Sequence, residues 1–238
     1  MNRLLSYDFS RLFHGLTLYF AGLAAIAAGV IGALLCPGYQ SVMAYSQAYL
    51  FLIPIGVILT VVFITTEYNY GILRNKVVNG FSRMMILQSW VTVLAVAGII
   101  LVAVYDLSVL LTHLVQGRRV FENMTPVTVL ANFAMVCVML LAAIVFSVAV
   151  CLVSTGFENI LAILFVFFAL GAVALIPDSL WRDSAILKTL FAVIPSSHLR
   201  DSIVAVPQSV AATLIGGMIL VILLGMSSLI MLMRKDLE

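Results

Sequence analysis

Long apolar stretches alternate with short polar connections along the whole chain. Six of them reach about 17 residues or more, the length that a helix needs to cross the hydrocarbon core of a bilayer. These stretches are residues 16–35, 45–66, 85–104, 127–153, 160–176 and 210–233. They are continuous rather than alternating, which favours helices over the roughly ten-residue strands of a barrel. We therefore predict an all-α membrane protein with six transmembrane helices in a single domain, residues 1–238.

Two features of these stretches leave a question open. The third runs to about residue 104 or beyond, because Asp106 falls where a longer helix would still lie near the headgroups. The first stretch contains Gly22, Gly29 and Gly32, which allow helices to approach closely. Small residues are also common in any packed span, so they indicate either a specific interface or ordinary packing.

The composition of the chain agrees with a membrane protein. Of the 238 residues, 64% are hydrophobic and only 9% are charged, with a mean hydropathy of +1.22. A soluble domain has about 25% charged residues, so this chain could not cover a water-facing surface. The net charge of +2 is small and says nothing about nucleic acid, which is not among the expected partners. The three cysteines, Cys36, Cys137 and Cys151, are scattered and suggest neither a disulfide framework nor a metal site.

The orientation in the membrane follows from the basic residues, which concentrate on the cytoplasmic side. With the N-terminus inside, the inner side receives Arg3, Arg11, Arg74, Lys76, Arg83, Arg234 and Lys235, and the outer side receives Arg118, Arg119, Arg182, Lys188 and Arg200. The inner ones lie close to the ends of the stretches, whereas the first outer loop has none. We predict a multi-pass protein of the cell (plasma) membrane with both termini cytoplasmic.

The segments outside the six stretches also carry apolar residues. In residues 1–14, Leu5, Phe9, Leu12 and Phe13 recur with helical spacing, which predicts an amphipathic helix lying in the plane of the inner leaflet. The outer connection, residues 177–207, contains apolar segments too short to span, followed by Pro195. A re-entrant hairpin before the sixth span and an amphipathic surface helix explain them equally well.

The most informative connection is EYNYGILRNKVVNGFSR, residues 67–83, between the second and third stretches. On a helix, Leu73, Val77 and Phe81 share one face, and Gly80 provides a stop. The other side carries Glu67, Gly71, Arg74, Asn75, Asn79 and Ser82. Topology-setting basic residues alone would explain Arg74 but not Glu67 or the glycine and asparagine spacing. We interpret the connection as a surface that docks another protein, with small Gly71 permitting close approach.

This connection resembles the cytoplasmic segment of type 2 ABC transporter permeases, above all the small six-helix permeases of bacterial two-component exporters. The family pattern is E-(aromatic)-x-x-G-(T/I)-(I/L)-R-N-K-x-x-x-G-x-S-R after the second span. The matching positions are Glu67, Tyr68, Gly71, Ile72, Leu73, Arg74, Asn75, Lys76, Gly80, Ser82 and Arg83. The motif covers one short segment, while the number of spans and the long last outer loop agree over the whole chain.

The resemblance implies a transport subunit and not an enzyme. In this family the segment is a coupling helix that sits in a groove of a separate ATP-binding cassette subunit, and ATP and Mg belong to that partner. It implies coupling roles for Glu67, Tyr68, Gly71, Arg74, Asn75, Lys76, Gly80, Ser82 and Arg83, with Glu67, Arg74 and Arg83 making polar docking contacts. It also implies a second permease subunit, identical or paralogous, contact of residues 3–13 with the ATP-binding subunit, and short re-entrant helices in residues 181–200.

The chemistry that the sequence lacks points the same way. There is no G-x-x-x-x-G-K-[ST] loop for ATP and no H-E-x-x-H metal motif, and no cofactor is expected in this chain. His198 and Asp201 have no paired nucleophile and are interpreted as a solvated loop pair. The stretches hold very few ionisable groups, which argues against a proton-driven carrier. An amphipathic or lipid-like cargo is expected, with antimicrobial and signalling peptides among the candidates.

The alternative is a non-transport membrane protein, such as a sensor or an immunity protein. Its cytoplasmic connection would then bind a different cytoplasmic regulator. Membrane lipid is an expected partner of the chain.

Overall fold

The computed structural model describes residues 1–35, 48–117, 126–153 and 207–234. Within these ranges the chain forms seven helices and no strands. The helices are α1 (Asn2–His14), α2 (Leu16–Leu35), α4 (Ala48–Asn69), α5 (Ile72–Val78), α6 (Arg83–Val115), α7 (Pro126–Val153) and α11 (Pro207–Arg234). The predicted all-α fold is confirmed for this part of the chain. The predicted fifth span, residues 160–176, and the outer connection lie outside it.

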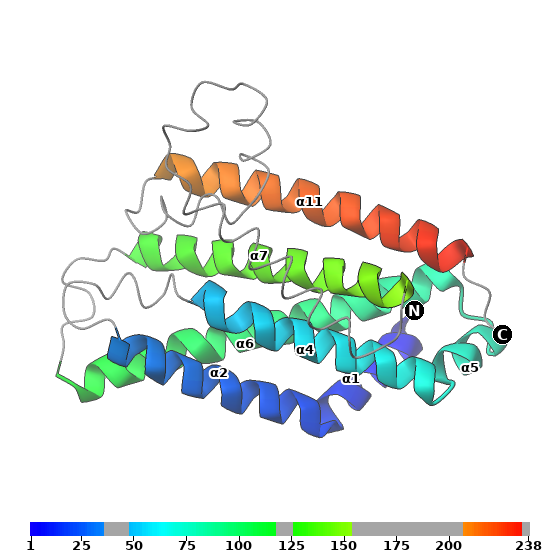
Figure 1. Cartoon of the computed structure of the whole chain (residues 1–238), viewed down its shortest axis with the longest axis horizontal. Coiled ribbons are helices and arrows are strands. Elements are labelled where there is room, and N and C mark those ends of the chain that lie inside the picture. The colour runs from blue at the N-terminus through cyan, green and yellow to red at the C-terminus, as the bar shows by residue number, and fades with distance from the viewer. Residues whose placement is uncertain (36–47, 118–125, 154–206, 235–238) are drawn as a thin grey trace.

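The long helices lie side by side, and α1 and α5 sit together at one end of the bundle (Figure 1). We call this end, where α4 finishes and α6 begins, the α5 end. α4 and α6 are the central helices, because each packs against α2 and α7 as well as against the other. α2 and α6 run away from the α5 end, whereas α4, α7 and α11 run towards it. The start of the chain and the C-terminal end of α11 therefore lie at the same end.

Four described helices are long and apolar enough to cross a membrane: α2, α4, α6 and α7. In α11 the qualifying apolar stretch is shorter, Leu214–Ile230. The membrane-spanning helical character predicted from the sequence is confirmed at this level, and the number of six spans stays a prediction. α7 and α11 run in the same direction (Figure 1), so Val153 and Pro207 lie at opposite ends of the bundle.

The third predicted stretch forms a helix that extends well beyond its expected end near residue 104. α6 continues to Val115, for 33 residues, and at about 1.5 Å per residue it measures about 50 Å. That is longer than the roughly 30 Å hydrocarbon core, so α6 projects beyond it. Asp106 does not end the helix, because a single half-buried carboxylate leaves the backbone hydrogen bonds intact. The helix ends where Gly117 adopts a φ of 66°.

Close helix contacts depend on small residues. A Cβ added at Gly29 of α2 would lie 2.8 Å from the Cβ of Ser108 and 2.8 Å from the backbone oxygen of Tyr105, both in α6. Gly29 therefore serves a specific helix interface, the first of the two readings of the glycines in this stretch. Gly22 does not, since a Cβ there would meet no atom within 4 Å. Without a hydrophobic driving force between helices in lipid, such close backbone approach is a main source of association.

Candidate functional site

The 67–83 connection is not one helix, as its pattern predicted, but two helix ends joined through a short helix. α4 continues through Asn69, and the chain then turns at Gly71, whose φ is 65°. Seven residues, Ile72–Val78, form α5, which Gly71 precedes as its N-cap. The left-handed backbone at this position favours glycine over other residues. Gly71 thus makes the turn into α5, a role that the helical reading of the sequence did not give it.

The other end of α5 is closed by a Schellman motif around Gly80. The amide of Gly80 donates to the carbonyl of Val77 at 2.9 Å, and the amide of Phe81 donates to that of Lys76 at 3.1 Å. Gly80 has a φ of 85°, as this motif requires. The predicted helix stop at Gly80 is therefore present. Ser82 then caps α6, because its hydroxyl accepts a hydrogen bond from the amide of Met85 at 3.3 Å.

The apolar face predicted for the connection is present. Leu73 is buried in the core, and Val77 and Phe81 are partly buried against it. Tyr68, in the last turn of α4, is half-buried with its ring tilted against Trp90 of α6 at 6.5 Å between centroids. These contacts hold α5 against the ends of α4 and α6.

Beside this apolar contact, on the same buried side of α5, lies a buried polar cluster, formed by Asp8, Arg11, Glu67, Lys76 and Ser89. The Nζ of Lys76 donates to Oδ1 of Asp8 at 2.7 Å and to Oε1 of Glu67 at 2.6 Å. Lys76 is 4% exposed, and both carboxylate side chains are fully buried. Lys76 therefore ties α5 to α1 and to α4 at the same time.

Arg11 and Ser89 complete the buried polar cluster. Nη1 of Arg11 lies 2.7 Å from Oε1 of Glu67, so this oxygen faces two cations. Nη2 of Arg11 donates to the backbone oxygen of Phe63 at 3.2 Å, and the guanidinium lies 4.0 Å from the Phe63 ring centroid. The hydroxyl of Ser89 in α6 donates to Oδ2 of Asp8 at 2.6 Å. The cluster thus connects four helices, α1, α4, α5 and α6.

The charges in the cluster balance, with two carboxylates against one lysine and one arginine. A buried pair of this kind adds little net stability over apolar packing, but removing one partner leaves an uncompensated buried charge. Directional hydrogen bonds also allow fewer arrangements than apolar contact does. The cluster therefore specifies how α1, α4, α5 and α6 sit relative to one another.

The side of α5 away from the cluster is open to solvent. Arg74, Asn75 and Asn79 are exposed there, together with Val78 and the preceding Tyr70, which are 77% and 76% exposed. We call these five residues the exposed α5 face. It combines a cation, two amides, an aromatic ring and an aliphatic side chain on a short, rigidly held helix. Tyrosine and arginine are enriched where proteins bind each other tightly.

Arg83 lies apart from the cluster and from the exposed α5 face. Its Nη1 donates to the backbone oxygens of Leu232 and Met233, each at 2.8 Å, at the C-terminal end of α11. The connection is thus linked to the last described helix as well as to α1.

The nine residues that the sequence singled out therefore divide by position. Glu67 and Lys76 are buried in pairs within the chain, and Arg83 binds α11. Gly71, Gly80 and Ser82 shape the backbone, and Tyr68 packs against Trp90. Arg74 and Asn75 are free to meet a partner's surface from the exposed α5 face.

Sequence reasoning missed Asp8 and Ser89. The stripe assigned to residues 1–14 was Leu5, Phe9, Leu12 and Phe13, but the buried side of α1 is formed by Leu4, Asp8 and Leu12. The signal was present, because these three residues recur every four positions on one helical face. An acidic residue inside an apolar stripe indicates a buried partner, and its partner, Lys76, is 68 positions away.

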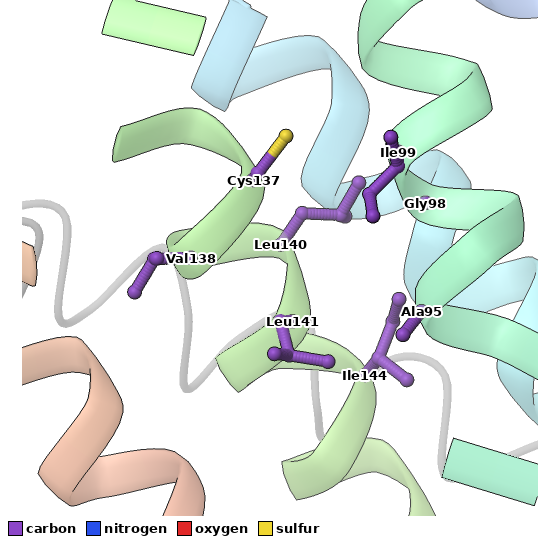
Figure 2. Close-up of a pocket in the computed structure, with 8 residues that line it drawn as sticks. All are labelled: Ala95, Gly98, Ile99, Cys137, Val138, Leu140, Leu141 and Ile144. Atoms are coloured by element: carbon purple, nitrogen blue, oxygen red, sulfur yellow. The ribbon is translucent and has the colours of Figure 1, made fainter. Parts of the chain in front are cut away.

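A small apolar cavity of about 100 Å³ lies between α6 and α7, and none of its lining residues belongs to the cluster (Figure 2). Its lining comprises Ala95, Gly98, Ile99, Cys137, Val138, Leu140, Leu141 and Ile144. Leu140 and Ile144 point from α7 towards α6, and the sulfur of Cys137 is the polarisable atom at the rim. The cavity has no charged group and is too small for a cargo molecule, so it adds nothing to the candidate site.

Within the described ranges, no group of three or more His, Cys, Asp or Glu side chains is placed to hold a metal ion. A comparison with protein-family models finds no match for this chain, and a comparison with curated protein sequences finds none either.

Proposed function

We propose that the chain is the membrane-spanning permease subunit of an ATP-driven exporter of the type 2 ABC class. In this proposal a separate ATP-binding subunit docks on the exposed α5 face, and movement of that subunit is passed to the spanning helices. A second permease subunit, identical or paralogous, forms the translocation path together with this one. The motif match in residues 67–83 is the reason for choosing this class.

One structural observation carries the proposal. α5 is a short helix with two different sides, one locked to α1, α4 and α6 through Lys76 and one exposed through Arg74 and Asn75. A helix that only connected two spans would need neither a buried ionic link nor an exposed recognition surface. A helix that receives a push and passes it on needs both. A partner can bias the equilibrium between two states of the bundle only if its contact differs between them.

The distribution of charge supports placing the α5 end in the cytoplasm. Six basic residues fall in the described ranges, Arg3, Arg11, Arg74, Lys76, Arg83 and Arg234, and all lie in α1, the 67–83 connection or the last turn of α11. These elements meet at one end of the bundle (Figure 1). Basic residues near span ends favour the cytoplasmic side, where an ATP-binding partner would be found.

The cargo class follows from the character of the spans. α2, α6 and α7 bring few ionisable side chains into the bundle, with Asp106 and His113 of α6 as the exceptions. A path built from such helices offers apolar and weakly polar contacts. It suits an amphipathic or lipid-like cargo, including antimicrobial and signalling peptides, better than a small ion.

The proposal is tested by purifying the chain with its native partners and measuring ATP hydrolysis. We expect a stable ATP-binding subunit to co-purify and its ATPase activity to respond to cargo. Arg74→Glu should leave the protein inserted and folded but weaken binding of that subunit by about fivefold or more, as expected for a residue near the centre of an interface.

Two controls sharpen this test. Arg74→Lys keeps the charge and should retain most of the binding. Gln116→Glu places a new acidic charge on an exposed position at the opposite end of α6 and should have no effect. Co-purification of a regulator without ATPase activity would instead favour the sensor or immunity alternative, and equal binding by the Arg74→Glu variant would exclude the exposed α5 face as the docking surface.

A further inference from the structure

Arg83 occupies an unusual position for a basic residue. It is the first residue of α6, directly after the N-cap Ser82. The N-terminus of a helix carries a partial positive charge, so local preference favours an acidic residue there. A cation at this position needs a compensating partner, and the described structure provides one outside α6.

That partner is the C-terminal end of α11. The last four carbonyls of a helix have no partner within the helix, and the end carries a partial negative charge. Nη1 of Arg83 donates to two of these carbonyls, those of Leu232 and Met233, at 2.8 Å each. Arg83 thus joins the start of α6 to the end of a helix 149 residues further along the chain. Figure 1 shows this end of α11 beside the start of α6.

α11 is also packed at this end, where Leu232 is fully buried in the core, so Arg83 adds a directed polar link to an apolar contact. α11 packs mainly along α7, and its contact with α6 is much smaller. One side of α11 is exposed over most of its length, as the exposure of Ile215, Ile222 and Met226 indicates. Arg83 is therefore a specific polar link between the 67–83 connection and α11.

We propose that Arg83 is a positioning residue that makes the cytoplasmic end of α11 move together with the 67–83 connection, so that displacement of α5 reaches the last span. This inference rests on the proposed function, and it adds a second route of transmission. Lys76 links α5 to α1 and α4, while Arg83 links the same connection to α11. Both routes begin within eight residues of each other, since Lys76 and Arg83 lie on either side of the Gly80 turn.

The experiment uses the full chain in lipid nanodiscs with Cys36, Cys137 and Cys151 replaced by serine. Met84→Cys and Met233→Cys, both at exposed positions, receive spin labels that report the distance between the two helix ends. In the unchanged Arg83 background we expect one narrow distance distribution. Arg83→Ala should broaden it, because the link between α6 and α11 is removed. An unchanged distribution would overturn the proposal.

The second readout is the amount of a fluorescent lipid analogue, used as the probe cargo, that the assembled complex moves per ATP hydrolysed. We expect Arg83→Ala to lower this ratio by about fivefold or more, the lower end of ordinary coupling effects. A bifunctional thiol cross-linker between the cysteines at positions 84 and 233 should restore it in the same variant. If Arg83 had a purely structural role, Arg83→Ala would lower thermal stability but leave the ratio unchanged, and that result would overturn the proposal.

Milder variants keep the test valid where Arg83→Ala does not fold. Arg83→Gln retains N–H donors without charge, and Arg83→Lys retains charge without the guanidinium; both should give intermediate ratios. Absence of any ATP-binding partner would refute the proposed function and with it the transmission role of Arg83. The spin-label distances, measured on the chain alone, would then still decide whether Arg83 joins α6 to α11.

Discussion

At Gly29, α2 lies directly against the backbone of α6, whereas at Lys76 four helices meet around a set of paired charges. The first contact consists of close van der Waals packing and has no preferred direction. The second consists of hydrogen bonds between ionised groups, which tolerate little rotation. The contact at Gly29 therefore holds α2 and α6 together by shape alone, while directional bonds between charged groups hold α1, α4, α5 and α6 as a unit at the α5 end.

This difference suits a protein that is driven from one end. A unit that receives force has to transmit it without deforming, and the buried polar cluster provides that stiffness. The predictions below test whether the two regions differ in this way, beginning with the largest expected effect.

Lys76→Met should be the most destabilising single change in the 67–83 connection. It leaves Asp8 and Glu67 buried with Arg11 as the only remaining cation, and removing one partner of a buried ion pair costs about 3–5 kcal/mol. Thermal unfolding in detergent measures the loss. The double variant Lys76→Met, Glu67→Gln removes one negative charge as well and should recover part of the stability. A single variant as stable as the unchanged protein would show that the cluster does not hold the helices.

Gly29→Ala should come next, at about 1–3 kcal/mol, the range for overpacking a well-packed contact. The added methyl would meet the Tyr105 backbone, which cannot give way as a flexible side-chain end can. Gly22→Ala is the matched control on the same helix, with open space around the added methyl. Equal effects of the two changes, measured by thermal unfolding, would mean that α2 and α6 do not approach closely at Gly29.

The sequence alone predicted the apolar helices better than their polar links. α2 and α7 end within one residue of their predicted limits, because continuous apolar runs bounded by turn residues leave little freedom. The Leu73, Val77 and Phe81 face followed from helical periodicity. The pairing of Asp8 with Lys76 could not be predicted, because it depends on how α1 packs against α6 and α2, which no local pattern specifies.

The break at Gly71 shows a second limit. A glycine inside a helical pattern is compatible with a continuing helix and with a turn, and only the directions of α4 and α5 decide between them. The sequence identified the segment that carries the proposed docking surface, but it did not show which side chains of that segment are exposed. The residue types of Glu67 and Arg74 look equally suited to meet a partner, yet one is fully buried and the other exposed.

Gly71→Ala should cost about 1–2 kcal/mol, the penalty of the left-handed backbone for a residue with a Cβ. No atom lies within 4 Å of the added carbon, so the backbone is the only source of the effect. Gly71→Asn should cost less, because asparagine adopts this conformation more readily. Thermal unfolding of both variants separates the turn from the close-approach role expected from the sequence. If Asn is as damaging as Ala in stability, backbone conformation is not the cause.

Arg74→Met should have the smallest effect on stability, within about 0.5 kcal/mol, because the side chain is exposed and away from the buried polar cluster. Lys76→Met is the matched substitution for this test. The two positions are two residues apart on α5, and both substitutions remove one positive charge. The order should reverse for binding of the proposed ATP-binding subunit to the folded protein. Arg74→Met would remove a contact with that partner, whereas Lys76 is almost fully buried and has little surface to offer it. Measuring unfolding and subunit affinity on both variants separates the two roles, because a helix that only connected spans would show the difference in stability and none in binding.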